Sequence, residues 1–177
     1  MALRTGTDLE SLLLQLEQQG TPPDSQALGE VAQNIGKCFH VEPDEVAVMQ
    51  LSGNGRALRF ILPEKLQAVG TIPLTSTAAL AARTARERRS DIVNNFAGAR
   101  HASVFEGVPL GRRQGESIQK IMSAPILRGD KVIGVAQISR KGTSSLDAGA
   151  DFNLNDLKQL QTLTHLLSRL LTLLQPE

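Results

Sequence analysis

The amino-acid sequence predicts an α+β fold, a sandwich in which helices pack against a mainly antiparallel sheet. Two pairs of β-type runs are each joined by a short turn, and strands joined in this way pair antiparallel. Amphipathic helical segments precede the first pair and follow the second, and another lies between the two pairs. With 177 residues and no internal repeat or low-complexity tract, the chain is expected to form one domain.

Two helices are predicted before the first strand. The first spans residues 7–20: Thr7 or Asp8 caps it, leucines recur at helical spacing, and a glycine followed by two prolines ends it. The second begins near Asp24 or Ser25, and its apolar residues fall within an arc of about 140°. This second helix is therefore expected to lie on the core.

The first hairpin joins residues 45–51 to residues 56–62. Its turn, Ser-Gly-Asn-Gly, contains an Asn-Gly pair, which supplies the positive φ angles that a tight turn needs. An alanine-rich helix over residues 77–88 and a strand over residues 90–96 follow. The next segment, residues 97–117, holds four glycines and is long enough to form a functional loop or lid.

The second hairpin joins residues 118–127 to residues 131–139 around an Arg-Gly-Asp triplet, which is interpreted simply as its turn. Pro125 predicts an edge or bulge position, because proline cannot donate a backbone hydrogen bond within a sheet. A polar linker over residues 140–151 leads to the last helix. There Asn153, with an aspartate three residues further on, predicts a capping box.

The last helix, which runs to about residue 174, is rich in leucine. From residue 157 onward its nine leucines spread over an arc of about 200°, about twice the width of one packing surface. We therefore expect a second buried surface, formed where the first and last helices bundle across a two-fold homodimer. The alternative is that the N-terminal helix of the same chain covers this surface.

Composition excludes several classes of function. The formal net charge of +1 gives no large positive field for nucleic acid, and five aromatic residues, all phenylalanine, are too few for a base-stacking platform. The single cysteine, Cys38, excludes an intramolecular disulfide, an iron–sulfur cluster and a multi-cysteine zinc site, and it fits a reducing cytoplasm. The leucine runs are too short or too interrupted for a signal peptide or membrane span, so a soluble cytoplasmic protein is expected.

Five segments carry a resemblance to a known family: residues 69–74, 91–95, 121–126, 132–138 and 152–157. In order and spacing they resemble the GAF domain family of small-molecule sensory modules, over about residues 25 to 175. The resemblance implies a GAF-like α/β/α sandwich with a central antiparallel sheet of about six strands, N- and C-terminal helices on one face and a ligand pocket on the other. We expect residues 1–23 to form an N-terminal helix and linker, and residues 24–177 to form the GAF-like domain with its long C-terminal helix.

The chain departs from the family's ligand-specific patterns. Members that bind cyclic nucleotides carry an Asn-Lys, Phe and Asp-Glu signature, whereas this chain has Asn94-Asn95-Phe96 and no downstream Asp-Glu pair. Bilin-binding members need a pocket cysteine, but Cys38 falls on the apolar arc of a flanking helix and is interpreted as a small buried hydrophobe rather than a redox sensor. Members that reduce methionine sulfoxide need several cysteines. The cofactor or ligand is therefore unidentified.

Candidate ligand-binding residues lie at the end of the 90–96 strand and in the glycine-rich loop after it. The resemblance implies that this region forms the pocket wall. The imidazole, two amides and apolar rings found there are expected to orient a small polar ligand inside a mostly apolar cavity. The alternative is an ordinary surface loop. No catalytic or metal site is expected, because the chain lacks a nucleophile elbow, a phosphate loop and a dinucleotide-binding motif. The candidates are Asn94, Asn95, Phe96, His101 and Phe105.

The sequence thus favours a non-enzymatic GAF-type sensory or regulatory domain, which binds a small molecule and signals through dimeric terminal helices. The alternative is a ligand-free scaffold for dimerisation or protein interaction. No nucleic-acid partner is expected. The basic residues around Arg83 and Arg100 alternate with acidic ones and lack aromatic interleaving, so they are interpreted as a solvated face.

Overall fold

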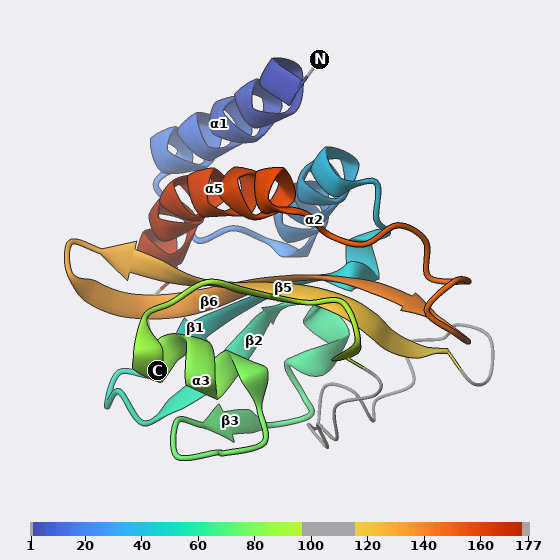
Figure 1. Ribbon diagram of the computed structural model, residues 1–177. Helices are drawn as coiled ribbons and strands as arrows, with labels where there is room; N and C mark the ends of the chain where they lie inside the picture. The colour runs from blue at the N-terminus through green and yellow to red at the C-terminus, as the bar shows by residue number, and fades with distance from the viewer. Residues whose placement is uncertain (1, 97–115, 175–177) are drawn as a thin grey trace.

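In the part of the chain that the structure describes, residues 2–96 and 116–174, six strands form one antiparallel sheet between two layers of helices (Figure 1). The structure is a computed structural model. The strands are β1 (Val46–Leu51), β2 (Ala57–Leu62), β3 (Thr71–Pro73), β4 (Asp91–Val93), β5 (Ser117–Arg128) and β6 (Lys131–Gly142). Their order across the sheet is β3-β2-β1-β6-β5-β4. The predicted α+β class is confirmed.

One face of the sheet is covered by α1 (Ala2–Gln19), α2 (Ser25–Phe39) and α5 (Leu154–Leu173), and the other by α3 (Leu80–Glu87) (Figure 1). The terminal helices therefore pack on one face, as expected. Two short 3-10 turns follow α2 and β2. They are η1 (Pro43–Glu45) and η2 (Glu64–Leu66).

Local sequence signals fix two of the helix starts. Asp24 accepts a hydrogen bond from the N–H of Ala27 at 2.8 Å and caps α2. In the capping box predicted for α5, Asn153 accepts from the N–H of Asp156 at 2.9 Å, and Asp156 accepts from the N–H of Asn153 at 2.8 Å. Both predictions are confirmed, whereas α1 begins at Ala2 rather than at residue 7.

Both predicted hairpins are present. In the β1–β2 turn, Asn54 accepts hydrogen bonds from the Ser52 hydroxyl and the Arg56 N–H at 2.7 and 3.0 Å. The glycine that follows Asn54 has a φ of +72°, and the glycine of the Arg-Gly-Asp turn has +59°; this region of φ favours glycine because it lacks a Cβ. Pro125 lies beyond the stretch of β5 that pairs with β4. It pairs with β6 on one side, and no described strand pairs with it on the β4 side.

Two further elements differ from the prediction. The strand β3 lies in a stretch for which no element was predicted, because three residues that include a proline give no alternating pattern. The helix α3 begins at Leu80 rather than at residue 77. The preceding loop is held instead by side chains: the Ser76 hydroxyl accepts from the N–H of Ala79 at 3.1 Å, and Arg86 donates to the carbonyls of Leu74 and Ser76.

Alternation along the strands sends apolar side chains to both faces of the sheet, where they form two cores. In β1, Val46 and Val48 belong to the core under α1, α2 and α5. Ala47 and Met49 belong to the core under α3. Each face of the sheet is thus closed by its own packed layer, and a ligand site on either face has to be found within or beside that layer.

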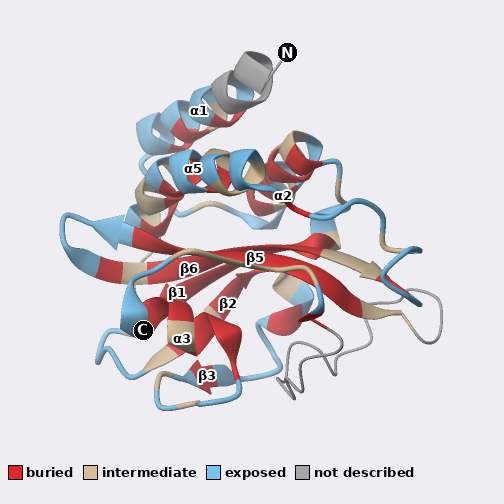
Figure 2. Cartoon of the chain, viewed as in Figure 1, coloured by how far each residue is buried: buried red, intermediate tan, exposed pale blue. Residues whose placement is uncertain are grey.

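The leucine-rich surface of α5 is covered from two sides. The helix contacts β5 and β6 beneath it and α1 across its outer side (Figure 1). From α1, the side chains of Leu9, Leu13 and Leu16 are buried in the same core (Figure 2). The second surface of α5 is therefore covered within the chain, as the alternative interpretation proposed. Among the helices described, none is long and apolar enough to cross a membrane.

Candidate functional site

The site residues predicted from the sequence do not all meet in one place. Asn94 follows β4; its Nδ2 donates to the carbonyl of Phe152 at 3.0 Å, and its Oδ1 accepts from the N–H of Phe152 at 2.9 Å. Through these two hydrogen bonds, the side-chain amide of Asn94 connects the end of β4 to Phe152, just before the start of α5. Asn95 is exposed, whereas Phe96 is buried in the core beneath α3. The two candidates outside the described residues are His101 and Phe105.

Beneath α3 lies a cavity of about 10 Å³. One water needs a volume of about 10–15 Å³, so the described side chains nearly fill this cavity. Phe96, one of the residues predicted from the sequence, lines this cavity. The other lining residues are Ile72, Ala79, Leu80, Ala81, Ile121 and Gln137.

A hydrogen-bonded polar cluster lies within this apolar layer. Ser123 of β5 and Gln137 of β6 are direct partners across the antiparallel pair, so both point to the same face. The Nε2 of Gln137 donates to the Oγ of Ser123 at 3.2 Å, and this Oγ lies 2.7 Å from the Oγ1 of Thr84 on α3. All three side chains are at most 4% exposed. Among the described residues Gln137 makes no other side-chain hydrogen bond, so its Oε1 is available as an acceptor.

Sequence reasoning missed this cluster, although a signal was present. Ser123 and Gln137 each interrupt an apolar run of strand residues. A polar side chain at a buried strand position must find a hydrogen-bond partner, because an unpaired buried polar group is costly. The partner Thr84, however, lies 39 residues from Ser123 along the chain, and no local pattern indicates that contact.

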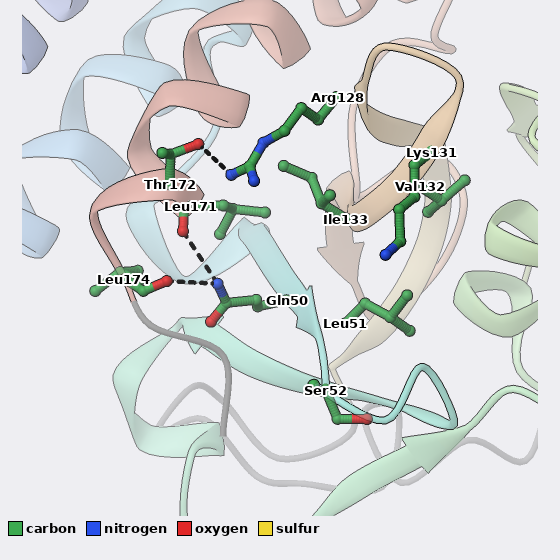
Figure 3. A pocket seen from close by; sticks show the side chains of 11 residues that line it. Gln50, Leu51, Ser52, Arg128, Lys131, Val132, Ile133, Leu171, Thr172 and Leu174 are labelled. Carbon is green, nitrogen blue, oxygen red and sulfur yellow. Dashed lines mark hydrogen bonds between the residues drawn. The ribbon is translucent and has the colours of Figure 1, made fainter.

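A second cavity, of about 370 Å³, lies at the C-terminal end of α5 (Figure 3). Its walls come from the end of α5, the end of β1 and the β5–β6 turn. Gln50 donates from Nε2 to the carbonyls of Leu171 and Leu174 at 3.1 and 2.9 Å, and Arg128 donates to the hydroxyl of Thr172 at 2.6 Å (Figure 3). No sequence prediction pointed to this cavity, because three segments distant in sequence form it.

The basic residues of α3 are engaged within the chain. Arg83 forms an ion pair with Asp91 at 2.7 Å, and Arg88 donates to the carbonyl of Asp130 at 2.9 Å. These contacts hold α3 against its neighbouring strand and turn. In the described ranges, no group of three His, Cys, Asp or Glu side chains is arranged to hold a metal ion.

Comparison with known families agrees with this architecture. A family model described as GAF domain matches residues 25–172. The chain therefore belongs to the GAF domain family. A search of curated proteins found no significant match.

Solved structures share the fold at low sequence identity. The GAF domain from an Acinetobacter phosphoenolpyruvate-protein phosphotransferase is 13% identical, with a TM-score of 0.69; the match covers 97% of this chain and 93% of that one. A methyl-accepting chemotaxis protein, residues 122 to 287, is 12% identical at a TM-score of 0.59, covering 82% and 88%. Free methionine-R-sulfoxide reductase from Neisseria meningitidis, in complex with its substrate, is 14% identical at 0.57, covering 95% and 90%. At these identities the likeness shows the fold alone.

Proposed function

We propose that this chain is a non-enzymatic sensory or regulatory GAF domain that binds a small, uncharged polar molecule beneath α3. The cluster of Thr84, Ser123 and Gln137 carries this proposal. Small-molecule sites are mostly apolar with a few placed polar groups, and the layer beneath α3 has this character. The described lining of the cavity contains no charged side chain, which favours an uncharged ligand with a donor for the Oε1 of Gln137.

Binding beneath α3 requires this layer to open, because the cavity is too small for a ligand in the closed state described above. Phe96 has the largest side chain among the described lining residues. In the sequence it directly precedes the segment that holds His101 and Phe105. A ligand that binds only the open state shifts the population toward it. We therefore propose that displacement of Phe96 accompanies ligand entry.

The proposed route for the signal runs through the terminal helices. The helix α5 packs on β5 and β6, the strands that carry Ser123 and Gln137, and α1 packs on α5. On α1, Leu14 is 48% exposed and is the proposed contact to a second copy of the chain in a homodimer. The single cysteine supports a reducing, cytoplasmic location.

The proposal excludes sulfoxide reductase activity, although some structural neighbours are named as such reductases. A reduction that ends in an intramolecular disulfide needs two cysteines, and the sequence contains one. Cys38 is partly buried, and its Sγ donates to the carbonyl of Asn34 at 3.4 Å. This environment fits a packing role on α2.

Ligand-observed NMR with a panel of small uncharged amides and alcohols tests the binding proposal. At least one member is expected to bind saturably to the full chain, and Gln137→Leu is expected to abolish that binding. Gln33→Leu, on the exposed side of α2, is the matched control and should bind as the unmodified chain does. Equal binding by Gln137→Leu would contradict the proposed site.

The alternative function is a ligand-free scaffold, and the nearly filled cavity favours it. Sedimentation velocity at micromolar concentration separates the two. A dimer that Leu14→Glu converts to a monomer, together with no binding by any panel member, favours the scaffold. A monomeric mass for the unmodified chain would contradict the homodimer, both for the sensory domain and for the scaffold.

A further inference from the structure

The cavity at the C-terminal end of α5 is not used by the proposed function. We propose that it binds a small organic anion, a molecule with an apolar body and a terminal carboxylate or phosphate. Its volume of about 370 Å³ falls within the range of small-molecule sites, which begins at about 300 Å³. The cavity lies at the end of the α5 layer rather than beneath α3, so the two sites are independent.

The charged side chains that line this cavity are both cations. Arg128 and Lys131 flank the β5–β6 turn; in Figure 3 Arg128 reaches toward Thr172, while Lys131 extends toward Leu51. Within the described residues, the ammonium of Lys131 has no hydrogen-bond or ion-pair partner, and no aspartate or glutamate lines the cavity. An anion here gains two charge-assisted contacts without breaking an existing ion pair.

The end of a helix ordinarily disfavours an anion, because its last carbonyls carry partial negative charge. Gln50 offsets this effect. Its Nε2 donates to two carbonyls of the last turn of α5, and its Oε1 accepts from Arg59 at 3.3 Å. Gln50 is 4% exposed, so packing holds the amide in this position. Two carbonyls at the helix end are therefore hydrogen-bonded to the neutral side-chain amide of Gln50, which in turn accepts a hydrogen bond from the cationic Arg59.

Apolar side chains form one part of the remaining lining, beside Ser52, Gly53 and Thr172. Leu51, Val132, Ile133 and Leu171 provide a surface for the body of the ligand. Leu171 lies directly on the backbone of β6: a Cβ added at Gly134 would come within 2.6 Å of its Cδ1. This wall is thus fixed by the contact between helix and sheet. An apolar wall below two cations selects an amphiphilic anion rather than an inorganic ion.

Two fluorescent probes of similar shape test the proposal on the full chain. The first, 8-anilinonaphthalene-1-sulfonate, has an apolar body and one negative charge, and the second, N-phenyl-1-naphthylamine, is uncharged. The sulfonate is expected to bind saturably at one site, about tenfold or more tightly than the uncharged probe. The double variant Arg128→Gln/Lys131→Gln is expected to lose about tenfold or more in affinity for the sulfonate and to bind the uncharged probe as before.

The matched control is Lys65→Gln/Lys158→Gln, which removes two exposed positive charges distant from the cavity in sequence and should leave both titrations unchanged. Ile133→Trp fills the cavity and should weaken both probes. Three results overturn the proposal: no saturable sulfonate binding, equal affinity in the Arg128→Gln/Lys131→Gln variant, or no effect of Ile133→Trp. Gln137→Leu, which tests the site beneath α3, should not alter sulfonate binding.

Competition identifies the headgroup. Sulfonate binding is measured in competition with phenyl phosphate or with benzoate, at an ionic strength held constant with chloride because screening weakens exposed charge contacts. Displacement by the phosphate alone assigns a phosphate headgroup, and displacement by the carboxylate alone assigns a carboxylate. Displacement by both supports a site for either anion, and displacement by neither counts against an anion site.

Discussion

Two of the cavities among the described residues of this GAF domain differ in packing and in charge. Beneath α3 the side chains leave about 10 Å³, and the polar groups bond to one another. At the end of α5 about 370 Å³ remains, and two cations line it. Helix α3 lies against the sheet, whereas the β5–β6 hairpin extends past the end of α5 (Figure 1). Of these two cavities, the larger lies where the α5 layer ends before the β5–β6 hairpin.

This difference predicts two modes of recognition. A site beneath α3 must open against packed side chains, and it selects its ligand through buried hydrogen bonds. A site at the end of α5 is already open and selects through charge, which salt screens. Substitutions in the two regions should therefore separate effects on folding from effects on binding.

The largest expected effect is that of Phe96→Ala, beneath α3. Phe96 is 4% exposed, and its truncation creates a cavity in the packed layer. The free energy of unfolding is expected to fall by about 3–5 kcal/mol. Urea unfolding followed by circular dichroism measures it, and Phe96→Leu, which removes less volume, should lose less. A loss below about 1 kcal/mol for the alanine variant would show that this layer is not closely packed.

The next largest effect is expected at Gly134, on β6 beside the end of α5. A Cβ there would come within 2.3 Å of the carbonyl oxygen of Met49 and 2.6 Å of Leu171, so the strand pair and the helix must both shift. Gly134→Ala should therefore cost about 1–3 kcal/mol in urea unfolding. As the control, Gly29→Ala in α2 meets no atom within 4 Å and should stabilise the chain by about 0.5–1 kcal/mol. An unchanged stability for Gly134→Ala would contradict the close contact that fixes the cavity wall.

A smaller effect is expected from Ser123→Ala. The variant leaves the Nε2 of Gln137 without its acceptor in a buried layer, at a cost of about 1–2 kcal/mol. Thr84 keeps the carbonyl of Leu80 as a partner at 3.0 Å, so the loss falls mainly on the glutamine. A double-mutant cycle with Thr84→Val, measured by urea unfolding, tests the contact. The double variant should lose less stability than the sum of the losses of the two single variants. Strict additivity would show that Thr84 and Ser123 do not interact.

Features set by neighbouring residues were predictable from the sequence. The Asn-Gly turn holding Asn54 and the capping box of Asn153 depend on groups within a few residues, and both are present. The three-residue strand β3 was missed because so short a segment has no period. The polar cluster beneath α3 and the cavity at the end of α5 were missed for a different reason: Gln50 meets Leu171 across 121 residues, and Ser123 meets Thr84 across 39. Such contacts follow from sheet register and helix packing, which no local pattern encodes.

The smallest expected effect on stability is that of Arg128→Gln/Lys131→Gln. Both side chains are exposed, and the variant gives up one exposed hydrogen bond, from Arg128 to Thr172. The free energy of unfolding should change by no more than about 0.5 kcal/mol, although anion binding is lost. Thr172→Val removes the same hydrogen bond but keeps both cations, and should retain binding. If the double variant instead unfolded at much lower urea concentration, the two cations would be structural, and its weakened sulfonate binding would report unfolding rather than recognition.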